Sequence, residues 1–236
     1  MSWHTGVLAA LAIQVDGPDV ETARITGACV MRVDRSGENT PIASTWPDSA
    51  PAEEVIAETT ALLLRAVRAG LPVVGFGVAD ALTVLDRECR RHGLSTLGEL
   101  VPDEVGPVVC ARVLDAHVSR RADPAQCPTL AEVCAAREVW LKDPGDLAWC
   151  AWAAAGLVAQ IVESSRSLAA MSAVELHAAQ AGWHREQSLA FAGVLRRRGE
   201  AGGAEDQLAV HAQADRAVGA AGSWPVAPFE QQGQLA

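Results

Sequence analysis

The stretch Val7-Leu8-Ala9-Ala10-Leu11-Ala12-Ile13-Gln14-Val15 contains a single polar side chain, and a Gly17-Pro18 turn follows it. A second strand-like run extends from Ile25 to Val33. Two such runs separated by turn residues predict a β-hairpin at the start of the chain. Alternate side chains of a strand point to the same face, so Ala12 and Gln14 should share one face. This face of the first strand therefore carries Gln14, the one polar side chain of the run.

Predicted strands and helices alternate after the hairpin. Further strands are expected at 40–46, 71–76 and 107–110, and helices at 51–69, 79–91, 129–139, 148–163 and 172–198. The segment 95–106, rich in Pro, Gly and acids, is expected to be a loop. Thr129 and Glu132 have the spacing of a capping box, which marks a helix start. The alternation indicates an α/β fold with a mixed sheet of about five strands flanked by helices.

Three regions differ in composition. Residues 1–165 carry the alternating pattern and are expected to form the α/β domain. Residues 166–200 contain apolar and amide side chains at every third or fourth position, which predicts a C-terminal helical extension. Residues 201–236 are rich in Ala, Gly, Gln and acids, and this low-complexity tail is expected to be partly disordered.

Charge and cysteine usage exclude several functions. The chain has 29 acidic residues against 19 Lys and Arg, a net charge of −10, which opposes a large phosphate-binding surface. Its six cysteines never lie two residues apart, so zinc-ribbon and thioredoxin spacings are absent.

No uncharged apolar stretch reaches roughly 18 residues, and the N-terminus lacks a signal-peptide pattern. We expect a cytoplasmic protein without membrane association.

Several motifs resemble the DnaQ-like, or DEDDh, 3′-5′ exonucleases, especially their actinobacterial subgroup. The most specific is the segment 70–77, Gly-Leu-Pro-Val-Val-Gly-Phe-Gly, followed by Leu-Thr-Val-Leu at 82–85 and Glu-Cys-Arg-Arg-His-Gly-Leu at 88–94. The segments 128–134 and 175–199 resemble the family's next helix start and its C-terminal helix. The resemblance implies a ribonuclease H-like fold with a C-terminal helix.

All five catalytic positions of that family are replaced in this chain. Where the family's first strand reads Asp-x-Glu, this chain has Ala12 and Gln14. Downstream, the resemblance places Ala81 at a metal-binding Asp, Gly145 at the general-base His and Cys150 at the last Asp. The segment 46–53 is also shorter than the family's substrate loop.

Two-metal cleavage of a phosphodiester needs carboxylates that hold two cations about 3.5–4 Å apart and a base that activates water. Alanine and glycine offer no side-chain ligand, and Gln14 offers a neutral amide. We therefore expect no catalytic residue, no metal and no cofactor, and a binding, scaffolding or regulatory role. The acidic balance and the striped C-terminal helix favour a protein partner or self-association over nucleic acid.

Two alternatives remain open. In the first, an active exonuclease uses Mg²⁺ or Mn²⁺ held by relocated acids, Asp16, Asp80 and Asp146; the simpler interpretation makes Asp16 a turn residue and the other two helix caps. In the second, a small-molecule enzyme or binder has reused the vacated cleft, with Cys150 as a nucleophile. Phe76, Trp149 and Trp152 are expected to line that cleft.

Overall fold

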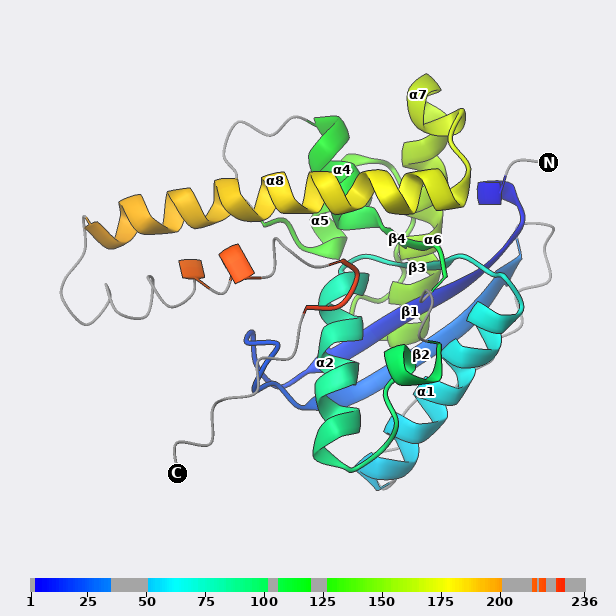
Figure 1. Cartoon of the computed structure of the whole chain (residues 1–236). Helices are drawn as coiled ribbons and strands as arrows, with labels where there is room; N and C mark the ends of the chain where they lie inside the picture. Colours follow the sequence, from blue (N-terminus) through cyan, green and yellow to red (C-terminus); the bar gives the residue numbers. More distant parts are fainter. Residues whose placement is uncertain are drawn as a thin grey trace.

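The computed structural model describes residues 3–34, 51–101, 106–119, 127–200, 214–215, 217–219 and 224–227. It has an α/β architecture, in which a four-stranded mixed sheet lies between helices (Figure 1). The strand expected at 40–46 and most of the tail expected to be partly disordered lie outside the described residues. The coarse fold class predicted from the sequence is therefore confirmed.

The sheet has the order β2-β1-β3-β4. The bounds of the strands are β1 Val7–Val15, β2 Ile25–Asp34, β3 Val73–Gly75 and β4 Val108–Cys110. The predicted hairpin is confirmed, because β1 and β2 pair in antiparallel register with Ala12 opposite Cys29. β3 pairs parallel with both β1 and β4. The carboxyl ends of β1, β3 and β4 therefore lie at the same end of the sheet.

Helices cover both faces of this sheet (Figure 1). α1 (Ala52–Arg68) and α2 (Val78–Arg91) lie on one face, and α6 (Leu147–Ser164) packs against β1 and β2 on the other. Short elements complete the fold: a 3₁₀ turn at Trp3–Thr5, α5 at Leu130–Ala136 and α7 at Arg166–Ala169. Parallel strands covered in this way read as continuous apolar runs, as the sequence of β1 does.

The capping box at the start of α5 is confirmed: the Glu132 N–H donates to Thr129 Oγ1 at 3.3 Å, and the Thr129 N–H donates to Glu132 Oε2 at 2.7 Å. Within the α/β domain expected at 1–165, two helices were missed. The expected loop at 95–106 contains α3 (Leu97–Leu100), which begins with its own capping box, and α4 (Ala111–Ser119) follows β4 without a connecting turn.

By length and composition α6 could span a membrane, since its 18 residues are strongly apolar. Half of that window is buried inside the protein, and the helix makes its main contacts with β1, β2 and α4. These contacts are those of a core helix, whose apolar residues are explained by burial.

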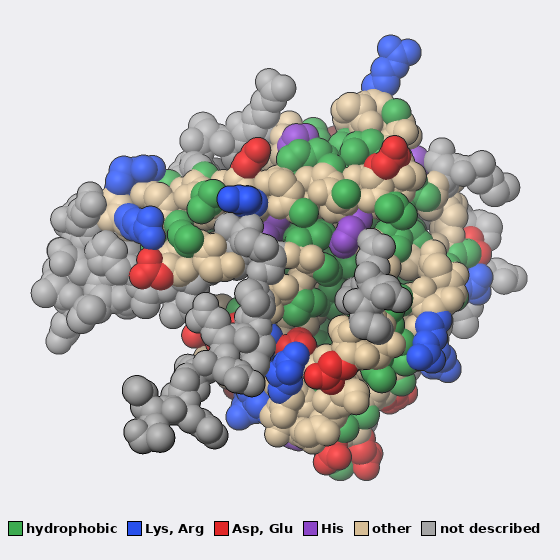
Figure 2. Space-filling view, viewed as in Figure 1, with side chains coloured by type: hydrophobic (Ala, Val, Ile, Leu, Met, Phe, Trp, Pro, Cys, Tyr) green, Lys and Arg blue, Asp and Glu red, His purple; other side chains and the backbone are tan. Residues whose placement is uncertain are grey.

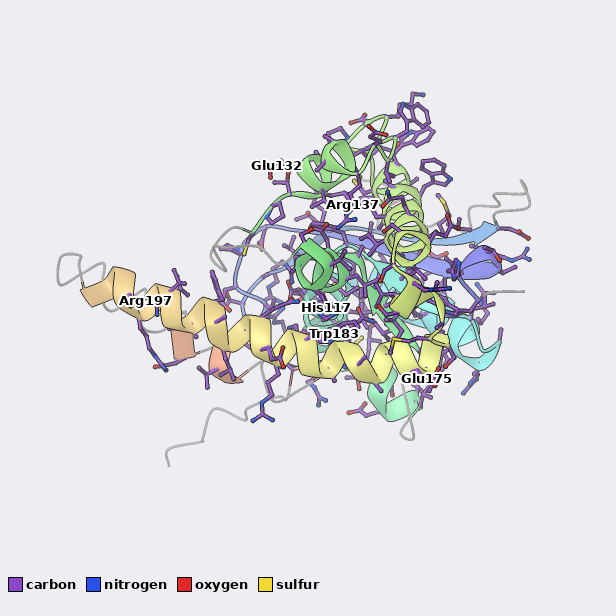
Figure 3. The ribbon with its side chains drawn as sticks, turned by 90° about the horizontal axis from the view of Figure 1, so that it is seen from above. His117, Glu132, Arg137, Glu175, Trp183 and Arg197 are labelled. Carbon is purple, nitrogen blue, oxygen red and sulfur yellow. The ribbon has the colours of Figure 1, made fainter. Side chains whose placement is uncertain are left out.

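α8 (Ala173–Glu200) is the long C-terminal helix expected from the sequence. Its first half covers the open edge of β4, while its second half projects beyond the sheet (Figures 1 and 3). Gln180 is fully buried: its Oε1 accepts from the Cys110 N–H at 2.8 Å, and its Nε2 donates to the Val108 carbonyl at 3.3 Å. Trp183 stacks on His117 of α4 with ring centroids 3.7 Å apart.

Apolar and histidine side chains lie side by side along α8, and acidic and basic side chains are scattered over the helix and the lower part of this face (Figure 2). Residues 224–227 also dock here. The Trp224 Nε1–H donates to His177 Nδ1 at 3.2 Å, and the Ala227 N–H donates to Thr83 Oγ1 on α2 at 3.1 Å. The helical extension and this short segment are thus packed against the α/β core.

Candidate functional site

A cavity of about 410 Å³ lies at the carboxyl end of β1, between the N-termini of α2 and α6. These two helices lie on opposite faces of the sheet (Figure 1). The lining residues are Leu11, Ala12, Ile13, Gln14, Val15, Gly17, Pro18, Val20, Phe76, Gly77, Asp80, Ala81, Val84, Leu130, Pro144, Gly145, Leu147 and Cys150. Ligands of open α/β sheets commonly bind at the carboxyl ends of the strands, so the position favours a binding site.

The cavity brings together all five positions singled out from the sequence: Ala12, Gln14, Ala81, Gly145 and Cys150. These residues come from β1, α2 and the start of α6, and more than 130 positions separate the first from the last. Their convergence was implied by the family resemblance, and neither composition nor periodicity required it.

Among the three acids of the alternative interpretation, Asp80 lines the cavity and the other two do not. Asp80 Oδ2 accepts from Arg112 Nη2 of α4 at 2.5 Å, and the carboxylate raises the pKa of Arg112 above its usual range. Asp80 is not the N-cap expected from the sequence: Gly77 holds that position, and Asp80 lies within the first turn of α2. The site therefore contains a carboxylate whose charge is balanced by a guanidinium.

The carboxylates of Asp16 and Asp146 have other roles. Asp16 Oδ1 accepts from the Arg24 N–H at 2.7 Å and closes the turn between β1 and β2, which agrees with the simpler interpretation. Asp146 is the N-cap of α6, as that interpretation also proposed, and its Oδ1 accepts from the N–H groups of Ala148 at 2.7 Å and Trp149 at 3.4 Å. Both carboxylates thus satisfy backbone donors.

We predict that Asp146→Ala destabilises the protein by about 1 kcal/mol, since an N-cap acid satisfies orphan N–H groups and faces the positive end of the helix. Asp146→Asn retains an acceptor and is expected to recover most of this loss. Urea unfolding of the three proteins measures the difference. Equal stability of Asp146→Ala and the unchanged protein would mean that the cap contributes nothing.

Trp149 and Trp152 do not line the cavity, which corrects the sequence-based expectation; Phe76 does line it. On α6 each residue is rotated by about 100° from the previous one, so when Cys150 faces the cavity its two neighbouring tryptophans cannot. They form an edge-to-face cluster with Trp140, with ring centroids 5.0–6.0 Å apart, and Lys142 Nζ lies 5.2 Å from the Trp149 ring. Trp140 belongs to the α5–α6 connection and is 59% exposed, so the cluster lies at the protein surface.

The thiol of Cys150 is partly buried and hydrogen-bonded. Its Sγ–H donates to the Pro144 carbonyl at 3.3 Å. Burial raises the pKa of Cys150, and the carboxylates of Asp146 and Asp143 raise it further. The thiol of Cys29, on β2, is fully buried, and its pKa is raised to about 11, mainly by burial. A thiolate nucleophile requires the opposite electrostatic environment.

Sequence reasoning missed Arg112, because the helix that carries it was not predicted. It also missed Leu130, which comes from the start of α5. Within the part of the chain that the structure describes, no group of three or more His, Cys, Asp or Glu side chains is arranged to hold a metal ion.

No family model matches the chain, and it matches neither a curated protein nor a solved structure.

Proposed function

We propose that this chain is a pseudo-exonuclease: a protein with a ribonuclease H-like, DnaQ-like fold that has lost exonuclease chemistry and acts by binding, as a scaffold or regulator. One observation carries the proposal. The five positions at which the DnaQ-like pattern requires an acid or a histidine converge on one cavity, and none of them bears such a side chain. A chance sequence match gives no reason for positions so far apart to meet.

The chemistry of the cavity supports a non-catalytic role. Two divalent cations about 4 Å apart repel each other and must shed water, so several carboxylates are needed to hold them. Of the described residues that line the cavity, Asp80 is the single acid, and Arg112 balances its charge. None of these described lining residues is a histidine that could activate water.

The alternative of an active exonuclease with relocated acids has less support. It needs Asp16, Asp80 and Asp146 to converge on metal ions, but two of these carboxylates bind backbone N–H groups and the third binds an arginine. A Cys150 nucleophile is equally poorly supported, since burial and two carboxylates raise its pKa. For the binding role, the net charge of −10 favours a protein partner or self-association over nucleic acid.

The proposal predicts that Mn²⁺ and Mg²⁺ leave the melting temperature unchanged and that the purified protein does not degrade single-stranded DNA or RNA. A variant that restores the acids, Ala12→Asp with Gln14→Glu and Ala81→Asp, provides the matched control. Restored carboxylates should bind Mn²⁺ in the folded state, which stabilises it by about 2.7 kcal/mol at a hundredfold excess over Kd.

Three outcomes are distinct. A higher melting temperature with Mn²⁺ in the restored variant alone supports both the proposed fold family and the loss of the site. A rise in the unchanged protein, together with nuclease activity that Asp80→Ala abolishes, establishes the active alternative. A rise in neither protein means that positions 12, 14 and 81 are not in ligating geometry, and the family assignment fails.

A further inference from the structure

We propose that the cavity at the end of β1 binds a small, uncharged organic molecule with a mostly apolar body and one hydrogen-bonding end. The proposal rests on the loss of metal chemistry argued above and adds the chemical class of ligand. It starts from the volume of the cavity, about 410 Å³. This volume lies within the range of about 300–1,000 Å³ that is typical of small-molecule sites.

The lining is mainly hydrophobic. Its apolar side chains come from β1 and the turn after it, from the β3–α2 connection and α2, and from the segments that begin α5 and α6: Leu11, Ala12, Ile13, Val15, Pro18, Val20, Phe76, Ala81, Val84, Leu130, Pro144 and Leu147. Removing apolar ligand surface from water contributes roughly 25 cal/mol per Å², so such a wall favours an apolar ligand body. Phe76 adds an aromatic ring to this wall.

Polar side chains in the lining are few. Gln14 offers an amide with both a donor and an acceptor. The thiol of Cys150 already donates to the Pro144 carbonyl, and Asp80 already accepts from Arg112. Gln14 is therefore the side chain best placed to bind one polar group of a ligand. Because Gln14 lies near the carboxyl end of β1, it would hold the polar end of the ligand there.

The charges at the site disfavour ions of either sign. An anion such as a phosphate would meet the carboxylate of Asp80, which also occupies the first turn of α2, where the helix dipole would otherwise attract it. At the second helix start, Asp146 occupies the N–H groups of α6. Arg112, which lies 2.5 Å from Asp80, balances the carboxylate that would otherwise attract a cation. The cavity therefore offers no unbalanced charge to an ion of either sign, and a neutral ligand needs none.

Two fluorescent probes test this charge preference directly. N-phenyl-1-naphthylamine is uncharged, apolar and carries one N–H group, and 8-anilinonaphthalene-1-sulfonate is the same ring system with an added sulfonate. We expect saturable binding of the uncharged probe to the full-length protein, at least about tenfold tighter than binding of the sulfonate. Asp80→Asn leaves Arg112 without its counter-charge and should strengthen binding of the sulfonate.

Two variants locate the probe in the cavity. Ala81→Leu fills it from α2, and Gly145→Leu fills it from the exposed segment before α6, where a Cβ contacts only the Asp143 side chain. Each should weaken binding of N-phenyl-1-naphthylamine at least about tenfold. Ala57→Leu makes the same change as Ala81→Leu at an exposed position of α1 and should bind as the unchanged protein does.

The proposal is overturned if the uncharged probe does not bind saturably, if both cavity-filling variants bind it normally, or if the sulfonate binds equally well. Near-UV circular dichroism of each variant separates a blocked cavity from an unfolded protein, and Gly145→Leu preserves the test if Ala81→Leu does not fold. Manganese-dependent nuclease activity would instead refute the proposed function, whatever the probes show.

Discussion

Gly75→Ala is expected to lower the free energy of unfolding by about 3 kcal/mol, at the upper end of the usual cost of overpacking a core. Gly75 ends β3, and a Cβ at this position would lie 2.7 Å from the Leu11 carbonyl oxygen and 3.1 Å from Val78 Cβ. The closer neighbour is backbone of the central strand, so it cannot move aside as a flexible side chain would. β1 would have to shift relative to β3, which would also disturb the wall of the cavity.

Gly17→Ala is the matched control, because a Cβ there meets nothing within 4 Å. It changes the same residue type at another position near the cavity and should leave stability within about 0.5 kcal/mol. Urea unfolding followed by circular dichroism measures both variants. If Gly75→Ala is as stable as Gly17→Ala, the close approach of β3 to β1 does not require glycine.

Gln180→Leu should destabilise the protein by about 3 kcal/mol, since it removes the buried side chain that pairs with the outer edge of β4. The Cys110 N–H and the Val108 carbonyl would then lose a partner, and each buried polar group left unpaired costs about 1–3 kcal/mol. The leucine recovers part of this loss through its apolar surface. Thermal unfolding and urea unfolding should both show that Gln180→Leu is less stable than the unchanged protein.

Gln187→Leu provides the comparison. Gln187 lies two turns further along α8 in a half-buried position, and its Nε2 donates to the Val113 carbonyl at 3.1 Å. Its substitution should cost about 1 kcal/mol or less. If Gln187→Leu lowers the free energy of unfolding as much as Gln180→Leu does, α8 stabilises the protein through general packing. The hydrogen bonds of Gln180 to β4 would then make no special contribution to stability.

The parts of the fold that were predictable have strong local signals. The β1–β2 hairpin, the capping box of α5 and the cap of α6 each depend on residues close together in sequence. α3 carried a capping box at Thr96 and Glu99 but has only four residues, too few for a periodic pattern. α4 begins immediately after β4, so the buried strand passes into the helix without a turn residue to mark the change.

For the candidate site, the positions on β1, α2 and α6 were foreseen and their surroundings were not. Alternation along a strand places Ala12 and Gln14 together, but no sequence pattern couples Asp80 to an arginine 32 positions away. The prediction that Trp149 and Trp152 line the cavity was wrong because it depends on how α6 is rotated about its own axis. Packing against the sheet sets that rotation. Charge balance in the cavity is thus a tertiary property, and it supports the choice of ligand proposed above.

The pairing of β4 with α8 also bears on how the chain is made. Cys110 and its partner Gln180 are 70 residues apart, so at about 5–20 residues per second the ribosome needs about 4–14 s to reach Gln180 after Cys110. During that interval the outer edge of β4 offers unpaired N–H and C=O groups to other chains. Nascent protein should therefore be most prone to aggregate just before α8 is complete, and truncation ahead of Gln180 should make this state permanent.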